Sequence, residues 1–332
     1  MSTAYIVEQG TKVRKSGHRL LVEKDGAPVA ELKLKDLEGL AVFGHVQLTT
    51  QALAELLAAG VPCSLLSVRG EYRGRLVGRA DRNVPLRIAQ FSTWREPRRR
   101  LDLARRLVAA KVANALAVLD RQARSHPDLD LAEARATLRS ADGRLAAAPD
   151  LDALRGVEGW LTRAYFSGLS RCVRGELTFA HRTTRPPADP FNALLSFGYV
   201  LVGNEITGLL YAHGFDPYIG IYHDVDYGRP SLALDVLEVF RHALVDRFVL
   251  FLSNNRVFTP GDFETRDDGG VYLRPPALKV FLRHYERRMG RPAAAEDGDA
   301  EPNWRAAFAR QIDDLAAALK SGGDLATFRV PG

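Results

Sequence analysis

The sequence contains very little cysteine: Cys63 and Cys172 are the two cysteines in 332 residues. Two cysteines cannot build the disulfide framework of a small secreted domain, and they cannot form a cysteine-based zinc site. This scarcity is typical of proteins in a reducing compartment. We therefore expect a cytoplasmic protein.

Long apolar stretches are also missing. No run of about 18 apolar residues occurs, so we expect no membrane-spanning segment and no membrane partner. The N-terminal stretch MSTAYIVEQGTKVRKSG lacks the apolar core of a signal peptide. The composition, with 46% hydrophobic and 26% charged residues, is ordinary for a soluble globular protein, and a length of 332 residues favours two domains.

The formal net charge is +6, and arginine carries most of the excess. Arginine pairs with phosphate through a planar fork, so an arginine-rich chain is a candidate for binding nucleic acid. Alanine is abundant as well, and a genome that prefers arginine would give the same charge. Composition alone leaves both interpretations open.

The hydrophobic period changes along the chain. The first 84 residues contain short alternating segments separated by turns, such as KDGAP at 24–28, which predicts a hairpin, and one short helix over 49–60. The rest follows a helical period. The sequence therefore predicts an α+β protein, with a small β-sandwich-like domain over residues 1–85 and a larger all-α catalytic domain over 86–332.

Residues 189–214 predict the central buried helix of the second domain. Asp189 is its N-cap, a proline takes the first helical position, Gly214 ends it, and the helix is apolar nearly all round. Glu205 lies within this apolar helix and needs a partner, which we expect to be an arginine. The polar segment 291–302 is predicted to be a disordered loop.

Acidic residues and a histidine gather in YHDVDYGRPSLALDVLEVFR, residues 222–241. Asp235 and Glu238 lie three residues apart, so they share one helix face beside apolar neighbours. Two nearby carboxylates repel unless a cation or a proton lies between them, although such pairs also occur on solvated helix faces. His223, in the preceding loop, is either a metal ligand or a hydrogen-bonded loop residue.

Glu158 is the third candidate ligand, in LRGVEGWLTRAYFSGL. Gly156 and Gly159 flank it and would let another helix approach its carboxylate; alternatively it is a surface glutamate near a helix start, where acids are favoured. Two carboxylates and an imidazole without sulfur suit Mn²⁺ or Mg²⁺. In an arginine-rich protein, such a set points to phosphodiester chemistry.

Four blocks of sequence resemble one family. They are GVEG followed by YF (156–166), RPPADPFNALLSFGYVLVGNEI (185–206), GFDPYIGIYH (214–223) and GRPSLALDVLEVFR (228–241). Together they resemble the Cas1 family, the CRISPR-associated integrase and endonuclease of spacer acquisition. The resemblance spans essentially the whole chain, and the predicted order of domains agrees with it.

The resemblance implies a ligand set and a reaction. Glu158, His223 and Glu238 would bind Mn²⁺ or Mg²⁺, and Asp235 would support the catalytic site. The 3′-hydroxyl of a short protospacer would attack a backbone phosphate of the CRISPR repeat in double-stranded DNA, with no nucleophile from the protein. The family forms homodimers through the N-terminal domain, and two dimers hold a dimer of the small protein Cas2.

DNA contacts should fall on phosphates, because the complex must accept many spacer sequences. The candidate basic residues are Arg163, Arg171, Arg174, Arg182, Arg185, Lys279 and Arg283. Tyr165 is a candidate for stacking on a base or positioning the DNA strand. Asn192 either hydrogen-bonds groups of the active site or takes part in helix capping.

Two alternatives use the same residues differently. A metal-dependent nuclease that cuts branched DNA in repair would have the same three ligands and would need only water. A non-catalytic DNA-binding scaffold would have a degenerate site, and the intact Glu158, His223 and Glu238 argue against it.

Overall fold

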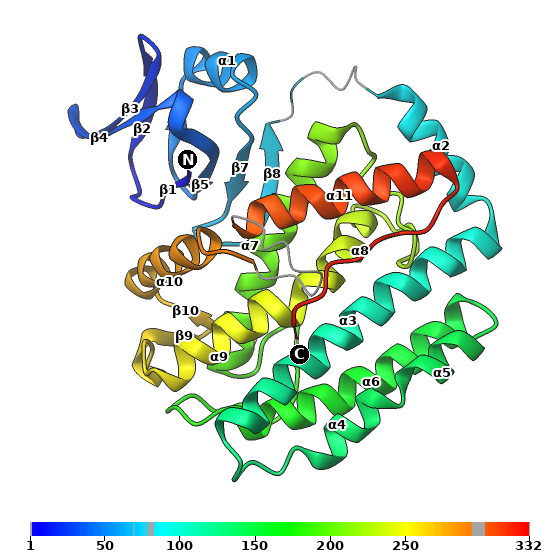
Figure 1. Ribbon diagram of the computed structural model, residues 1–332. Helices are drawn as coiled ribbons and strands as arrows, with labels where there is room; N and C mark the ends of the chain where they lie inside the picture. The colour runs from blue at the N-terminus through cyan, green and yellow to red at the C-terminus, as the bar shows by residue number, and fades with distance from the viewer. Residues whose placement is uncertain (1, 69, 77, 79–82, 294–302, 332) are drawn as a thin grey trace. The chain divides into compact units, whose positions relative to one another are not determined.

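The computed structural model describes residues 2–68, 70–76, 78, 83–293 and 303–331, and these divide into two compact units (Figure 1). The first unit contains residues 1–80 together with 273–290, and the second contains 81–272 together with 291–332. The expected combination of an N-terminal β-sheet domain and a mostly helical C-terminal domain is confirmed. The loop predicted over 291–302 lies mostly outside the described residues.

The first unit holds two four-stranded sheets. The order β1-β5-β7-β8 describes one sheet and β4-β3-β2-β6 the other. In the first sheet, β5 runs parallel to both β1 and β7, and β8 is antiparallel to β7. The strands are β1 (Ser2–Ile6), β2 (Lys12–Ser16), β3 (Arg19–Lys24), β4 (Ala27–Lys33), β5 (Leu37–Phe43), β6 (Gln47–Leu48), β7 (Cys63–Leu66) and β8 (Tyr72–Leu76), with a 3-10 turn, η1 (Leu34–Asp36), before β5.

Local sequence signals explain this unit well. The predicted hairpin joins β3 to β4, and its turn uses Asp25 and Gly26 at φ 51° and 79°, a conformation that glycine tolerates. Helix α1 (Thr50–Ala58) begins where the Thr49 side chain accepts a hydrogen bond from the Ala52 amide, 3.2 Å away. Leu20 and Leu56 are fully buried in the core.

Helix α10 (Pro275–Met289) differs from the expected boundaries, because it groups with the first unit and not with the helical one. The Tyr5 hydroxyl of β1 donates to Glu286 over 2.6 Å, and Lys279 donates to Glu8 over 2.8 Å. These long-range contacts are invisible to a reading of local periods. The second unit is also not wholly helical, since η3 (Pro260–Asp262) leads into the short strands β9 (Phe263–Thr265) and β10 (Val271–Leu273).

The second unit is built around the long helix α3, which packs against α6 and α8 (Figure 1). Figure 1 places α3 between these two helices, so residues from all three can meet. The helices are α2 (Val84–Trp94), α3 (Pro97–Ser125), α4 (Ala132–Arg139), α5 (Ala141–Ala147), α6 (Leu151–Cys172), α7 (Pro190–His213), α8 (Ser231–Phe240), the π-helix η2 (Arg241–Asp246), α9 (Arg247–Asn254) and α11 (Trp304–Ser321).

Helix α7 is the buried helix that the sequence predicts. The Asp189 side chain caps it by accepting from the Asn192 amide at 2.7 Å, and Gly214 ends it at φ 89°. Among the described helices it alone is long and apolar enough to cross a membrane, but 61% of its apolar window is buried inside the protein, as in a core helix. Glu205 pairs with both Nε and Nη2 of Arg305, at 2.8 and 2.9 Å, which confirms the expected arginine partner.

Both cysteines should be inert in the folded protein. They are free thiols and fully buried, and burial raises the pKa of Cys63 to about 12 and that of Cys172 to about 11. At about pH 8 neither forms the reactive thiolate, so iodoacetamide should label neither until the chain is unfolded. Mass spectrometry of native and urea-treated protein would measure this; rapid native labelling of either cysteine would contradict the structure.

Candidate functional site

A single carboxylate organises the loop that carries His223. Asp235 of α8 is fully buried, and it accepts hydrogen bonds from the backbone amides of Ile221, Tyr222 and His223 at 2.5, 3.0 and 2.9 Å. It also contacts Nδ1 of the His223 ring at 2.7 Å. These four contacts use its acceptor capacity, so Asp235 acts on His223 by holding the loop and orienting the ring.

Two arginines hold the same loop from the other helices. Arg100 of α3 donates to the Ile221 carbonyl at 2.6 Å and to Asp224 at 2.8 Å. Arg155 of α6 donates to the Tyr222 carbonyl at 2.9 Å and lies 2.6 Å from Asp224. Burial works against ionisation of Asp224, but the hydrogen bonds from the two guanidinium groups outweigh it and lower the pKa of its carboxyl.

The loop also depends on Gly220. A Cβ at this position would lie 2.4 Å from the His223 carbonyl oxygen and 2.7 Å from the Ser231 Cβ. Both neighbours are fixed, because the first is backbone and the second is attached to the start of α8. The close approach leaves room for glycine alone.

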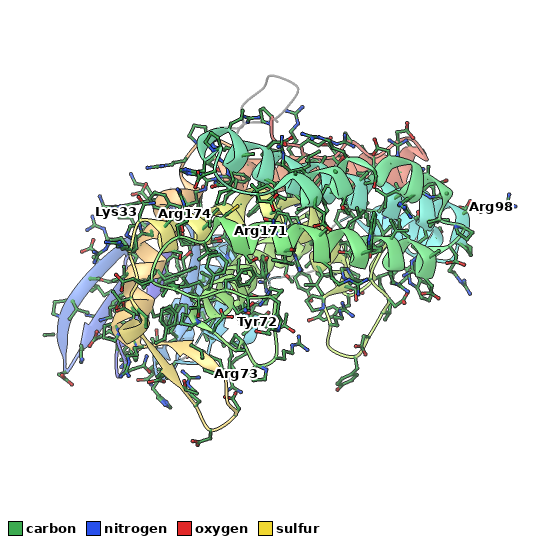
Figure 2. The ribbon with its side chains drawn as sticks, turned by 90° about the horizontal axis from the view of Figure 1, so that it is seen from below. Lys33, Tyr72, Arg73, Arg98, Arg171 and Arg174 are labelled. Atoms are coloured by element: carbon green, nitrogen blue, oxygen red, sulfur yellow. The ribbon has the colours of Figure 1, made fainter. Side chains whose placement is uncertain are left out.

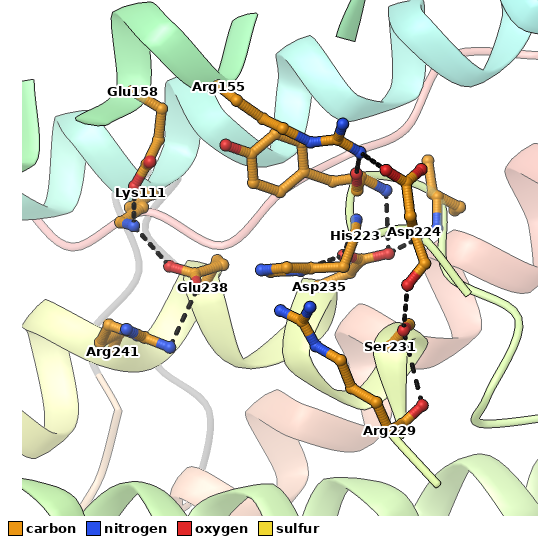
Figure 3. A network of polar contacts seen from close by, with 12 residues as sticks. Lys111, Arg155, Glu158, His223, Asp224, Arg229, Ser231, Asp235, Glu238 and Arg241 are labelled. Atoms are coloured by element: carbon orange, nitrogen blue, oxygen red, sulfur yellow. Dashed lines mark hydrogen bonds and ion pairs between the residues drawn. The ribbon is translucent and has the colours of Figure 1, made fainter. Parts of the chain in front are cut away.

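Glu158 and Glu238 face one another across a lysine (Figure 3). Glu158 comes from α6 and Glu238 from α8, and Lys111 of α3 donates a hydrogen bond to Glu158 and lies 2.6 Å from Oε2 of Glu238. Arg241 lies 3.0 Å from Oε1 of Glu238, and Thr162 donates to Glu158 at 2.8 Å. The cation that the carboxylate pair requires is therefore supplied by the protein itself, and the solvated-face alternative does not apply to Glu238, which is only 4% exposed.

Both glutamates are held ionised. Burial alone would raise the pKa of the Glu238 carboxyl, but Arg241 and Lys111 outweigh it and hold that pKa well below its usual range. Burial also acts to raise the pKa of Glu158, but Lys111 outweighs this effect, and the pKa is lowered. The pair therefore offers negative oxygen donors at neutral pH.

The donor set suits a hard divalent cation in its chemistry. Oε2 of Glu238 is buried and makes no well-directed hydrogen bond, and the ring of His223 extends from Asp235 toward Glu238 (Figure 3). Within the described part of the chain, however, no three His, Cys, Asp or Glu side chains surround a common point as metal ligands would. The ammonium of Lys111, between the two glutamates, accounts for that spacing.

Comparison with known proteins identifies the family. The family model for CRISPR associated protein Cas1 matches residues 4–287. The chain is a Cas1-family CRISPR-associated endonuclease.

The Cas1 relatives fall into two sizes. A Cas4/Cas1 fusion of Geobacter sulfurreducens is 40% identical over 293 residues, covering 86% of this chain but 52% of the fusion, so the chain spans about half of that protein. An endonuclease Cas1 of Thermus thermophilus is 36% identical over 291 residues, covering 87% of this chain and 85% of the relative.

Solved structures agree on the Cas1 fold. A CAS1 protein from Thermotoga maritima superimposes with a TM-score of 0.82 at 24% identity, covering 96% of this chain and 97% of that one. A casposase bound to its integration product gives a TM-score of 0.86 at 22% identity, covering 98% and 92%.

Several residues of this Cas1 site escape sequence reasoning. Lys111 is one cation in a long helix full of arginines, and Arg241 follows Glu238 by a single turn. Arg229, labelled in Figure 3, lies in the loop before α8, where no periodic signal marks it. The glycines beside Glu158 also mislead, because a Cβ on Gly156 or Gly159 would meet nothing within 4 Å.

Most predicted DNA-contact residues of this Cas1 chain are exposed. Arg163, Arg174 and Arg185 are exposed in the second unit, and so is Arg171, which lies 2.7 Å from Asp130. Figure 2 labels Arg171 and Arg174. Arg163 and Arg171 line a pocket of about 270 Å³ between α4 and α6, together with Trp160. Lys279 and Arg283 are exposed on α10 and so belong to the first unit.

One of these expectations is wrong, and a second residue is engaged within the fold. Tyr165 is fully buried, with its ring 4.0 Å from that of His242, so it cannot stack on a base. Arg182 is turned inward, where it donates to Asn192 at 2.8 Å and lies over the Tyr199 ring at 5.4 Å. Tyr165 lies on the same helix as Glu158, but the sequence alone does not indicate which side of that helix faces the core.

Asn192 takes part in capping at the start of α7, which is the second of the two expected roles. Its side chain accepts from the Thr183 amide at 3.0 Å, and donates to the His181 carbonyl at 2.9 Å and to the Asp189 carboxylate at 2.6 Å. Its contacts therefore fix the segment that enters α7.

The role of Gly220 can be tested by adding one methyl group. Gly220→Ala should destabilise the protein by about 1–3 kcal/mol, because the backbone around His223 must shift. Gly143→Ala is the matched control, since its Cβ would meet nothing within 4 Å and alanine favours the α5 helix. Urea unfolding of both variants measures the difference; equal stabilities would show that the loop adapts.

Proposed function

We propose that this chain is the metal-dependent integrase of CRISPR adaptation, joining the 3′-hydroxyl ends of a short DNA to repeat DNA by transesterification. The proposal rests mainly on one observation, the pair of buried Glu238 and half-buried Glu158 with the His223 ring oriented toward it by Asp235. Hydrolysis of branched DNA, which needs water in place of the 3′-hydroxyl, would use the same site, and the endonuclease names of the relatives favour keeping it as a second activity.

Glu158, Glu238 and His223 would hold Mn²⁺ or Mg²⁺. Such a cation polarises a phosphate and stabilises the charge that develops on its oxygens. Asp235 accepts at Nδ1 of His223, which leaves Nε2 as the ring nitrogen with a lone pair to give. Arg241 stays on the second oxygen of Glu238 and so leaves Oε2 directed to the site.

The proposed partners are duplex DNA, a second copy of the chain and Cas2. Duplex DNA would be bound through phosphates by the exposed arginines of α6 and the segment after it. A fold neighbour described as a Cas6-RT-Cas1–Cas2 complex, with a TM-score of 0.82, supports Cas2 as a partner, and one described as a TtCas1–DNA complex, with a TM-score of 0.59, supports DNA. The homodimer through the first unit rests on the family resemblance alone. Two buried free thiols are consistent with a cytoplasmic setting.

Strand transfer tests the reaction. The protein is mixed with Cas2, a labelled duplex with 3′-hydroxyl ends, and a plasmid carrying a leader and repeat, in Mn²⁺ or in chelator. We expect joining that requires metal and falls about 100-fold or more in His223→Ala, because a ligand is lost. His18→Ala, at an exposed histidine of the first unit, should behave as wild type.

The outcomes separate the candidates. Equal joining by wild type and His223→Ala would remove His223 from the site. Cutting of branched DNA in Mn²⁺ without any joining would favour the nuclease, and metal-independent DNA binding without either reaction would favour a scaffold.

Salt dependence tests the DNA surface. Replacing Arg163 and Arg171 together by alanine should weaken binding by a similar factor for every DNA sequence. The slope of log K against log salt should fall by about 0.9 for each phosphate that the variant no longer neutralises. Lys320→Ala, an exposed lysine on α11, is the control for a simple change in net charge. An unchanged slope in the double variant would show that these arginines do not bind phosphate.

A further inference from the structure

We propose that Lys111 is an internal counter-ion that a divalent metal must displace, so that this lysine sets the metal affinity of the site. The inference rests on the proposed metal site and adds a competitor to it. It concerns a residue outside the three candidate ligands.

The position of the ammonium carries the argument. Lys111 is 4% exposed, and its Nζ contacts Glu158 while lying 2.6 Å from Oε2 of Glu238. A hard divalent cation held by those two glutamates would need the same carboxylate oxygens that the ammonium now contacts, at about 2.0–2.1 Å in the case of Mg²⁺. The ion and the ammonium would then occupy the same space, so only one of them can be present.

The charges favour the same exchange. Glu158, Glu238 and Asp235 bring three negative charges, and Lys111 and Arg241 bring two positive ones. Adding a divalent ion with both cations in place would leave an excess of buried positive charge, which is costly. Releasing the ammonium when the metal enters brings this group of charges to neutrality.

Of the two cations, Lys111 is the one able to leave. The guanidinium of Arg241 lies over the Tyr199 ring at 4.6 Å and contacts Oε1 of Glu238, the oxygen that the exchange does not need. Among the described contacts, Lys111 has only the two glutamates as partners, and its four-carbon stem is flexible. Oε2 of Glu238 makes no well-directed hydrogen bond, so the contact with the ammonium is an ion pair that a metal can replace.

Two substitutions should move metal affinity in opposite directions. Lys111→Met keeps the length and removes the charge, so the Kd for Mn²⁺ should fall about tenfold or more, while the melting temperature in chelator falls because two neighbouring carboxylates, one of them buried, are left without their shared cation. Lys111→Arg keeps the charge and can pair through a fork, so its Kd for Mn²⁺ should rise. Lys320→Met is the matched control.

The readouts are the electron paramagnetic resonance signal of free Mn²⁺ and the melting temperature with Mn²⁺ or with chelator. Mn²⁺ should raise the melting temperature of Lys111→Met by more than that of wild type. If Lys111→Met unfolds in chelator and folds in Mn²⁺, the exchange is supported; if it stays unfolded in both, Lys111→Arg decides, and an unchanged or lower Kd in that variant overturns the proposal.

A failure of this inference is distinguishable from a failure of the metal site. If wild type binds Mn²⁺ and His223→Ala does not, the site stands, and equal Kd values in wild type and Lys111→Met then reject the exchange. If neither wild type nor Lys111→Met binds Mn²⁺ at millimolar concentration, the metal site itself is rejected.

Discussion

The burial of two carboxylates one turn apart on α8 is the constraint on which the rest of the site depends. Asp235 and Glu238 are both almost completely inaccessible to water, and a buried charge without partners is strongly destabilising. Asp235 is satisfied by three backbone amides and an imidazole, so the loop around His223 has to wrap over it. Glu238 is satisfied by Lys111 and Arg241, so α3 has to pack against α8. The position of His223 beside the glutamate pair therefore follows from the need to give partners to the two buried carboxylates of α8.

A further buried acid, Asp246, lies just beyond the end of α8 and is also balanced by its neighbours. The chain continues into a π-helix over Arg241–Asp246, and π-helical turns occur often at functional sites. In this turn Arg241 returns to Glu238, while Asp246 binds the His242 ring at 2.6 Å and also accepts from the Tyr199 hydroxyl. Burial and the neighbouring cations lower the pKa of His242, with burial the larger cause, and Asp246 works in the opposite direction. A third buried acid is thus balanced by neighbours within one turn, next to the proposed metal site.

The features that the sequence predicts correctly depend on neighbouring residues, and those it does not predict depend on contacts between residues far apart in the chain. The caps of α1 and α7 and the hairpin turn lie in a few neighbouring residues, so the local sequence is enough to predict them. The three candidate ligands were found because their types and motifs are distinctive. Lys111 was missed because its meaning comes from two helices far along the chain, and Tyr165 was misassigned because a helix period does not say which face is buried. The grouping of α10 with the first unit depends on contacts with residues more than 250 positions away, Tyr5 and Glu8.

The positive charge of the chain has to be interpreted in the light of these contacts. The net charge of +6 suggests a DNA-binding protein, but a number of arginines are engaged inside the fold. Arg100 and Arg155 hold the His223 loop, Arg182 and Arg241 face Tyr199, and Arg305 neutralises Glu205. A guanidinium that satisfies a buried carbonyl or carboxylate is not available to a phosphate. Other arginines remain at the surface on several elements, such as Arg98 of α3 and Arg283 of α10, and the exposed candidates Arg163 and Arg171 lie on α6, the helix that supplies Glu158. Exposure alone therefore does not single out a DNA path, and Arg163 and Arg171 are distinguished from the other exposed arginines by sharing a helix with a proposed metal ligand.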